Sequence, residues 1–76
     1  MRTGPKVDPK ERPSYIAQMM TSLRLEAGLS QGELAKLMYT HQTVVAKWEN
    51  GRLYPNLNTL EKLAEVLGKR LEVRFV

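Results

Sequence analysis

The chain has 76 residues, a formal net charge of +4 and no cysteine, which allows one small domain with a single hydrophobic core. This length excludes a large catalytic cleft between domains, and the absence of cysteine excludes disulfides, thiolate nucleophiles and cysteine-ligated zinc. Since no apolar run approaches the roughly 18 residues needed to span a bilayer and the polar start lacks a signal peptide's apolar stretch, we expect a cytoplasmic protein without a membrane partner.

Residues 1–13 form a basic segment that is rich in proline. Three of the four prolines lie here, and four basic residues against two acidic ones give the segment a net charge of +2. Its large apolar side chains are limited to Met1 and Val7, too few to contribute to a core. We interpret the segment as a flexible basic arm, with a terminal tail that has no role as the alternative.

Apolar residues at steps of three and four predict a first helix from Ser14 to about Ala27. Ser14 follows Pro13 and suits the N-cap, while Gly28 can adopt the left-handed conformation that ends a helix. The expected buried face consists of Ile16, Met19, Met20, Leu23 and Ala27.

A capping box predicts a second, short helix. The hydroxyl of Ser30 can accept the backbone N–H of Glu33, while the Glu33 carboxylate reaches back to the N–H of Ser30. The expected inward side chains of this helix are Leu34, Ala35, Leu37 and Met38.

Apolar spacing resumes after Thr40 and predicts a third helix over about 41–49. Val44, Val45 and Trp48 form its apolar side, and Asn50 with Gly51 provides the stop. Two helices this close in sequence must cross at a steep angle. We assign Trp48 to the core rather than to stacking on a base.

A fourth helix is predicted up to Gly68, with Asn56 after Pro55 as its cap. Its expected buried stripe consists of Leu57, Leu60, Leu63, Ala64 and Leu67.

After Gly68 the apolar period changes to two, which predicts a C-terminal strand over 71–76. Leu71, Val73 and Phe75 alternate there with charged residues. A lone strand leaves its backbone groups unpaired, so we expect the same segment of a second chain to pair with it, making Leu71, Val73 and Phe75 a homodimer interface. A frayed tail or the start of a longer, truncated domain is the alternative.

Taken together, these segments resemble the Cro/lambda-repressor (Xre) type of helix-turn-helix domain. The resemblance covers about residues 16–68 and rests on LRLEAGLSQGELA (23–35), VAKWENG (45–51) and PNLNTL (55–60). It implies a mainly α fold, a compact four-helix lambda-repressor-like domain at 14–68. The short C-terminal β-strand predicted within 69–76 departs from the family, many of whose members continue with a fifth helix after this point.

The resemblance implies that the second helix of the motif enters the major groove of double-stranded DNA. Position by position, Gln42, Thr43 and Lys47 would face base edges, with His41 close by. A glutamine can pair with adenine, a lysine can donate to guanine, and a threonine methyl can meet a thymine methyl.

Two further sets of positions carry over from the resemblance. Gln31, Asn50 and Arg52 match positions that hold phosphates, which fix register without reading sequence. Arg24 and Glu49 match an internal ion pair, and we assign them to structure rather than to DNA reading.

Two residues depart from the family pattern. Tyr39 stands in the turn where glycine is common, so a left-handed backbone there would cost about 1 kcal/mol. His41 stands at a cap position usually held by Ser or Thr, although Thr40 could cap instead. Either change could rotate the recognition helix slightly.

The resulting functional hypothesis is a sequence-specific DNA-binding transcriptional regulator, a repressor, that binds a roughly palindromic operator in the nucleoid as a homodimer. One alternative is an antitoxin that binds a toxin protein and represses its own operon, and another is a protein-binding adaptor on the same scaffold. No enzyme, metal or cofactor is expected, because His41 is the single histidine and the glutamates are explained by capping, ion pairing and helix surfaces.

Overall fold

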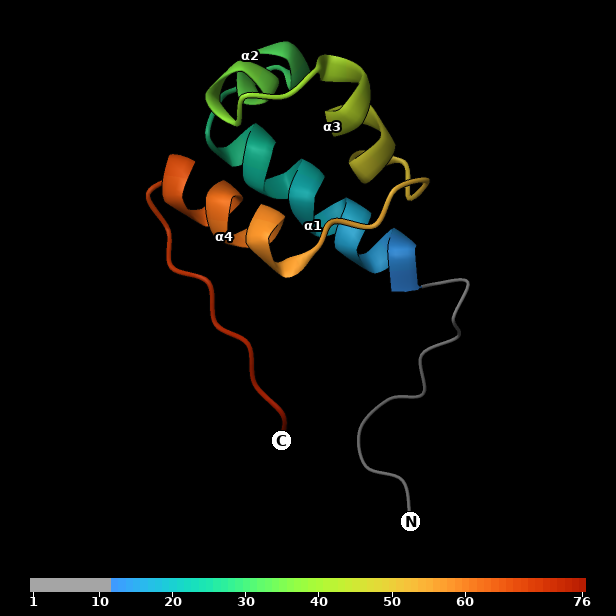
Figure 1. The fold of residues 1–76 in the computed structure, drawn as a ribbon, viewed down its shortest axis with the longest axis vertical. Coiled ribbons are helices and arrows are strands. Elements are labelled where there is room, and N and C mark those ends of the chain that lie inside the picture. The colour runs from blue at the N-terminus through green and yellow to red at the C-terminus, as the bar shows by residue number, and fades with distance from the viewer. Residues whose placement is uncertain (1–11) are drawn as a thin grey trace.

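The computed structural model describes residues 12–76, and helices make up most of this part of the chain (Figure 1). They are α1 (Arg12–Glu26), α2 (Gln31–Leu37), α3 (Gln42–Glu49) and α4 (Leu57–Val66). α2 and α3 lie at one end of the long axis, and the chain after α4 trails toward the other end. Among residues 12–76, no helix is both long enough and apolar enough to cross a membrane. The four helices that the sequence predicts are thus confirmed in number and order.

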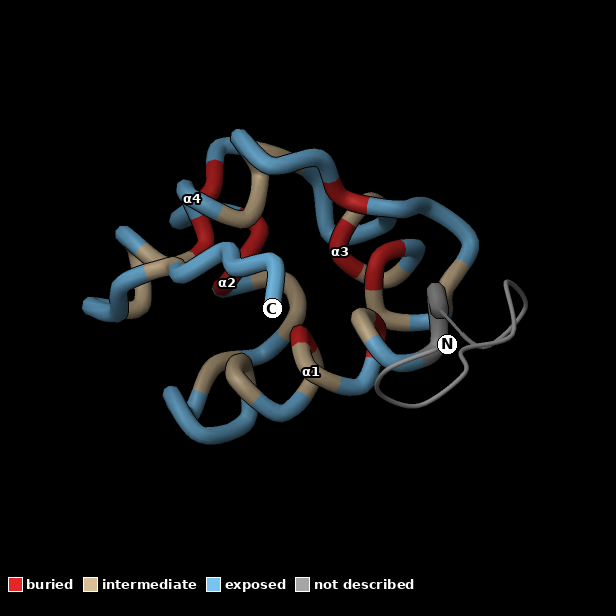
Figure 2. Tube along the Cα trace, turned by 90° about the horizontal axis from the view of Figure 1, so that it is seen from below, coloured by how far each residue is buried: buried red, intermediate tan, exposed pale blue. Residues whose placement is uncertain are grey.

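The hydrophobic core takes side chains from all four helices. Met20 of α1, Leu34 of α2 and Val45 of α3 are fully buried, and Leu63 comes from α4. Figure 2 shows buried positions, in red, on all four helices. Burying each such side chain stabilises the fold by about 2 kcal/mol. Trp48 is buried in the same cluster, as predicted, and is therefore not available to stack on a base.

The caps predicted at the starts of two helices are confirmed. At α2, the Ser30 hydroxyl accepts the Glu33 N–H at 3.0 Å, and the Glu33 carboxylate accepts the Ser30 N–H at 2.7 Å. At α4, the side-chain oxygen of Asn56 accepts the N–H of Thr59 at 2.8 Å. Each contact satisfies backbone donors that the first helical turn leaves free.

All four helices end in the same motif, in which a left-handed residue lets two backbone N–H groups turn back onto the last carbonyls. At the end of α1, Gly28 donates to the Leu25 carbonyl at 3.0 Å and Leu29 donates to the Arg24 carbonyl at 3.2 Å. Glycines also occupy the left-handed position after α3 and α4, but after α2 the position holds Tyr39, with φ of 56°.

Tyr39 is the one non-glycine residue with positive φ among residues 12–76. The residue is 88 % exposed, and the Lys62 ammonium lies 5.1 Å from the ring centroid. We expect Tyr39→Gly to be more stable than Tyr39→Ala by about 1 kcal/mol, because both variants lose the ring but only glycine relieves the clash of Cβ. Urea denaturation of the two variants measures the difference. Equal unfolding midpoints would show that the left-handed backbone costs nothing here.

The start of α1 differs from the prediction. The helix already includes Arg12 and Pro13, so Ser14 lies inside it and is not its N-cap. Proline is compatible with a first helical turn because its missing N–H would have no partner there. The rest of the predicted arm, residues 1–11, lies outside the described residues.

The start of α3 and two inward faces also differ. The N-cap of α3 is His41, whose side chain makes no capping hydrogen bond, so Thr40 is not the cap. Leu37 and Leu57, predicted to point inward, are exposed, because they lie in the last turn of α2 and at the first residue of α4. Ala27, which was also predicted to be buried, is exposed. Ala17 belongs to the core, although the sequence pattern did not predict its burial.

The predicted strand over 71–76 is wrong for the single chain. Residues 69–76 have no regular secondary structure, and no strand occurs in the part of the chain that is described. The physical reason is that no other described segment bonds to the backbone of 71–76, and a strand needs such a partner. Val73 and Phe75 are exposed at the end of the chain.

Candidate nucleic-acid interface

α2 and α3 pack against each other as a helix-turn-helix unit, and α3 also packs against α1. The inward side of α3 is fixed by Val45 and Trp48, which are buried. The helical period therefore turns the other side of α3 to solvent. The side chains predicted to face bases lie on this outer side or at its start, and all are exposed: His41, Gln42, Thr43 and Lys47.

Three residues are predicted to contact phosphate, and two of them, Asn50 and Arg52, lie where α3 ends and the next loop begins. Asn50 and Arg52 are both exposed, and the Asn50 side-chain oxygen accepts the backbone N–H of Arg52 at 3.0 Å. This bond shapes the turn that ends α3 and leaves the amide N–H groups of Asn50 free to donate. The loop thus presents one cation and one amide donor beside α3.

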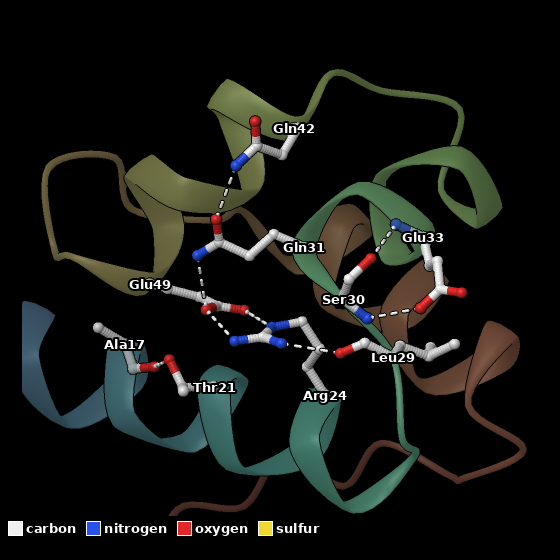
Figure 3. Close-up of polar contacts among 9 residues, drawn as sticks. All are labelled: Ala17, Thr21, Arg24, Leu29, Ser30, Gln31, Glu33, Gln42 and Glu49. Atoms are coloured by element: carbon white, nitrogen blue, oxygen red, sulfur yellow. Dashed lines mark hydrogen bonds and ion pairs between the residues drawn. The ribbon is translucent and has the colours of Figure 1, made fainter.

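A chain of hydrogen bonds links α1 to the start of α3 (Figure 3). The Arg24 guanidinium donates to both oxygens of Glu49, at 2.7 and 3.1 Å, and to the Leu29 carbonyl at 2.8 Å. Gln31 Nε2 donates to Glu49 Oε1 at 3.0 Å, and Gln42 Nε2 donates to Gln31 Oε1 at 2.9 Å. We call Arg24, Glu49, Gln31 and Gln42 the polar chain. It contains the ion pair that the resemblance implies between Arg24 and Glu49.

The polar chain fixes which way the Gln42 amide points. A carboxylate can only accept hydrogen bonds, so Gln31 must turn its Nε2 toward Glu49 and its Oε1 toward Gln42. Gln42 consequently donates one N–H to Gln31 and keeps its Oε1 and a second N–H free on the exposed side of α3. One acceptor beside one donor is the pattern that complements adenine N6 and N7.

The structure gives Gln31 and Glu49 roles that the sequence did not. Gln31, predicted to hold a phosphate, is half-buried with its side chain engaged on both sides. Glu49, predicted to be purely structural, also holds Gln31 in place. These contacts join residues 18 and 11 positions apart on two different helices, so no helical or strand period could have revealed them.

The hydrogen bonds of two glutamates shift their pKa values downward. Desolvation acts to raise the pKa of Glu49, but the hydrogen bonds from Arg24 and Gln31 and the charge of Arg24 outweigh it, and the pKa is lowered. The backbone N–H of Ser30, followed by its hydroxyl, lowers the pKa of Glu33. The bond to Glu49 in turn raises the pKa of Arg24. All three groups therefore hold their charge more firmly in the folded state.

These shifts predict a loss of stability in acid. A carboxylate with a lowered folded-state pKa contributes stability that is present above its unfolded pKa of about 4.5 and is lost as pH falls through the folded value. We expect the free energy of unfolding to decline as the pH falls from about 4.5 toward the lower folded-state pKa, as urea denaturation at pH 7, 5, 4 and 3 can measure. Glu33→Gln should weaken the decline, whereas Glu61→Gln, at an exposed position, should leave it unchanged. An identical decline in all three proteins would contradict the assignment to Glu33.

A family of known proteins and several individual relatives are similar to this chain. The model of a family described as helix-turn-helix, HTH_3, matches residues 20–73. Multiprotein-bridging factor 1c of Arabidopsis thaliana is 42 % identical over 56 residues, which cover 74 % of this chain and 38 % of that protein. The chain spans less than two fifths of the length of this and two other curated relatives.

Two solved structures have the same fold. An HTH_3 family transcriptional regulator from Vibrio cholerae superposes with a TM-score of 0.69 at 32 % identity, over 75 % of this chain and 32 % of that one. HipB, in a complex with a 20mer named O2, superposes with a TM-score of 0.67 at 25 % identity, over 96 % and 97 %. Another structure holds HipB together with HipA, O2 and O3.

Proposed function

Because this chain belongs to the helix-turn-helix family HTH_3, we propose that it is a sequence-specific DNA-binding transcriptional regulator that represses by occupying an operator. The observation that carries the proposal is the exposed side of α3, on which the polar chain holds the Gln42 amide ready for a base. A helix presented in this way can enter the major groove of double-stranded DNA.

Within this proposal, contacts to bases and to phosphates come from different places. Gln42 pairs with an adenine, Lys47 donates to a guanine, and Thr43 meets a thymine methyl, with His41 beside them. Asn50 and Arg52 hold the phosphate backbone from the loop after α3 and carry no sequence information. We assign Gln31 to orienting Gln42, since its amide is already bonded at both ends.

We further propose that the regulator acts as a homodimer joined through the C-terminal segment. Val73 and Phe75 are apolar side chains that the single chain leaves in solvent, and a second copy offers the matching apolar surface and the missing strand partner. A two-fold symmetric dimer presents two recognition helices in opposite directions, so its operator is roughly palindromic.

Selection of bound duplexes from a random pool tests the function. We expect enrichment of two inverted half-sites, and an affinity that falls steeply with salt because each phosphate contact releases counterions. Recovery of unrelated sequences with equal affinity would remove the sequence-specific role. Absence of any affinity for duplexes at low salt would favour a protein-binding adaptor instead, the reading compatible with the multiprotein-bridging relative.

A second candidate function is an antitoxin that also represses its own operon. The observation that favours it is the match to HipB over almost that whole chain, together with the structure in which HipB is combined with a second protein, HipA. Co-expression with the product of the adjacent reading frame, followed by co-purification, tests this candidate. An adjacent product that inhibits growth and is neutralised by this chain would support it, whereas failure to neutralise would leave the plain regulator.

A further inference from the structure

The C-terminal segment, residues 69–76, carries two distinct rows of side chains. It leaves the end of α4 and trails away from the helices (Figure 1). Leu71 is half-buried beside Ala64 and Glu65 of α4, but Val73 is 62 % exposed and Phe75 is fully exposed. In an extended chain these three side chains share one face. The outer part of that face, Val73 and Phe75, is apolar and has no cover in the described part of the chain.

The intervening positions hold charges. Glu72 lies between two arginines, with its carboxylate oxygens 4.0 Å from the guanidinium nitrogens of Arg70 and Arg74. All three side chains are largely exposed, so these contacts contribute little and are easily exchanged for others. Glu72 and Arg74 are therefore free to pair with a second chain.

Two-fold symmetry limits how two such segments can pair. Side chains directly opposite each other in an antiparallel pair lie on the same face of the sheet. A two-fold axis perpendicular to the sheet carries each side chain to the same face of the sheet. One residue of the segment must therefore lie directly opposite its own copy, and we call this the residue on the axis. A slip by one residue would set apolar side chains against charged ones.

Charge then selects the residue on the axis. An axis at Glu72 places Glu72 against its own copy and Arg70 against Arg74, and an axis at Arg74 places Arg74 against its own copy. An axis at Leu71 would set Phe75 against Leu67, which is the C-cap of α4 and cannot be part of a strand. An axis at Val73 sets Glu72 against Arg74 twice and Leu71 against Phe75 twice, and opposite charges in such positions are stabilising.

We propose that two copies of this chain pair through residues 71–76 as antiparallel strands with Val73 on the two-fold axis and Glu72 of each chain facing Arg74 of the other. The inference rests on the proposed homodimer and adds its register. In this register, the contacts between Glu72 of one chain and Arg74 of the other favour pairing of the segment with a second copy of itself.

Charge reversal in the full chain tests the pairing. Glu72→Lys alone and Arg74→Glu alone each create two like-charge contacts, so each should weaken dimerisation by about tenfold, as measured by analytical ultracentrifugation. An equimolar mixture of the two variants should form heterodimers, because both contacts then join opposite charges. Mixing Glu72→Lys with Arg70→Glu is the control and should give no such rescue. Rescue by the control, or none by the Arg74→Glu mixture, would overturn the register.

Cysteine substitution gives a second readout that does not depend on charge. The chain has no cysteine of its own, so Val73→Cys should form a disulfide-linked dimer under mild oxidation. Leu71→Cys and Phe75→Cys should each link poorly to themselves, because four residues, roughly 13 Å, separate the two copies. A mixture of those two variants should link readily. Efficient self-linking of Leu71→Cys in place of Val73→Cys would contradict the proposal.

Deletion of residues 71–76 separates this inference from the proposed dimer. A truncated chain that is monomeric, while Val73→Cys links, supports both. A truncated chain that stays dimeric overturns both the dimer through this segment and its register. A tail-dependent dimer in which Val73→Cys fails to link overturns the register alone. A monomeric full chain at all concentrations overturns the homodimer and the register but leaves DNA binding untouched.

Discussion

Arg24→Ala should lower the free energy of unfolding by about 3 kcal/mol, because it leaves a largely buried carboxylate without its partner. The Arg24 and Glu49 side chains are only 12 % and 6 % exposed, and Arg24 also donates to the Leu29 carbonyl where α1 turns into α2. The substitution removes three hydrogen bonds and the positive charge that pairs with Glu49. In a domain of this size such a loss lowers the melting temperature by about 15 °C.

Thermal unfolding monitored by circular dichroism measures this effect. Arg24→Lys should recover only part of the loss, because an ammonium cannot form the two parallel bonds of a guanidinium. Arg74→Ala provides the matched control, since Arg74 is exposed and its contact with Glu72 is weak; it should change the melting temperature by no more than about 2 °C. A melting curve for Arg24→Ala that overlays the parent would show that Glu49 tolerates the loss of its partner.

Gln42→Ala should reduce affinity for the selected operator duplex by about 10- to 100-fold, while affinity for a random duplex of equal length changes by less than about twofold. The reason is that Gln42 carries the oriented donor and acceptor proposed to read adenine. Fluorescence anisotropy at one fixed salt concentration measures both affinities. Gln18→Ala is a matched control, because Gln18 is an exposed glutamine on α1, far from α3 in the chain. Equal losses on both duplexes would remove Gln42 from base reading.

Gln31→Ala decides between two roles for Gln31. If Gln31 acts by orienting Gln42, the variant should lose specific affinity only, and Gln31→Ala with Gln42→Ala should lose no more than Gln42→Ala alone. If Gln31 held a phosphate directly, as the family resemblance implies, its loss would weaken binding to both duplexes and would add to that of Gln42→Ala. A double-mutant cycle on the operator duplex therefore tests the polar chain itself.

The features that could be predicted from sequence are those whose causes lie within a few residues. The capping box of Ser30 and Glu33, the cap at Asn56 and the glycine after α1 each involve neighbouring residues, so their residue types alone specify the local hydrogen bonds. The apolar period placed Met20, Leu34, Val45 and Leu63 in the core for the same reason. The prediction of buried side chains failed near helix ends, as at Leu37 and Leu57. There the burial of a side chain depends on which segments lie beyond the end of the helix.

The strand prediction shows the other limit. Alternation at Leu71, Val73 and Phe75 correctly marks a segment with one apolar side, but alternation is only half of what a strand requires. The other half is a neighbouring backbone to bond with, and residues 12–76 of the single chain provide none. The proposed dimer would supply it from a second copy.

The sequence by itself determined where the four helices begin and end to within a few residues, most of the side chains that fill the core, and that α3 has one outward side. Only the tertiary structure decided that Glu49 reaches Gln31, and that Gln31 holds the Gln42 amide in one orientation. Helix periods and caps depend on contacts between near neighbours in the chain, whereas this polar chain depends on how three helices cross. No pattern along the sequence encodes that angle.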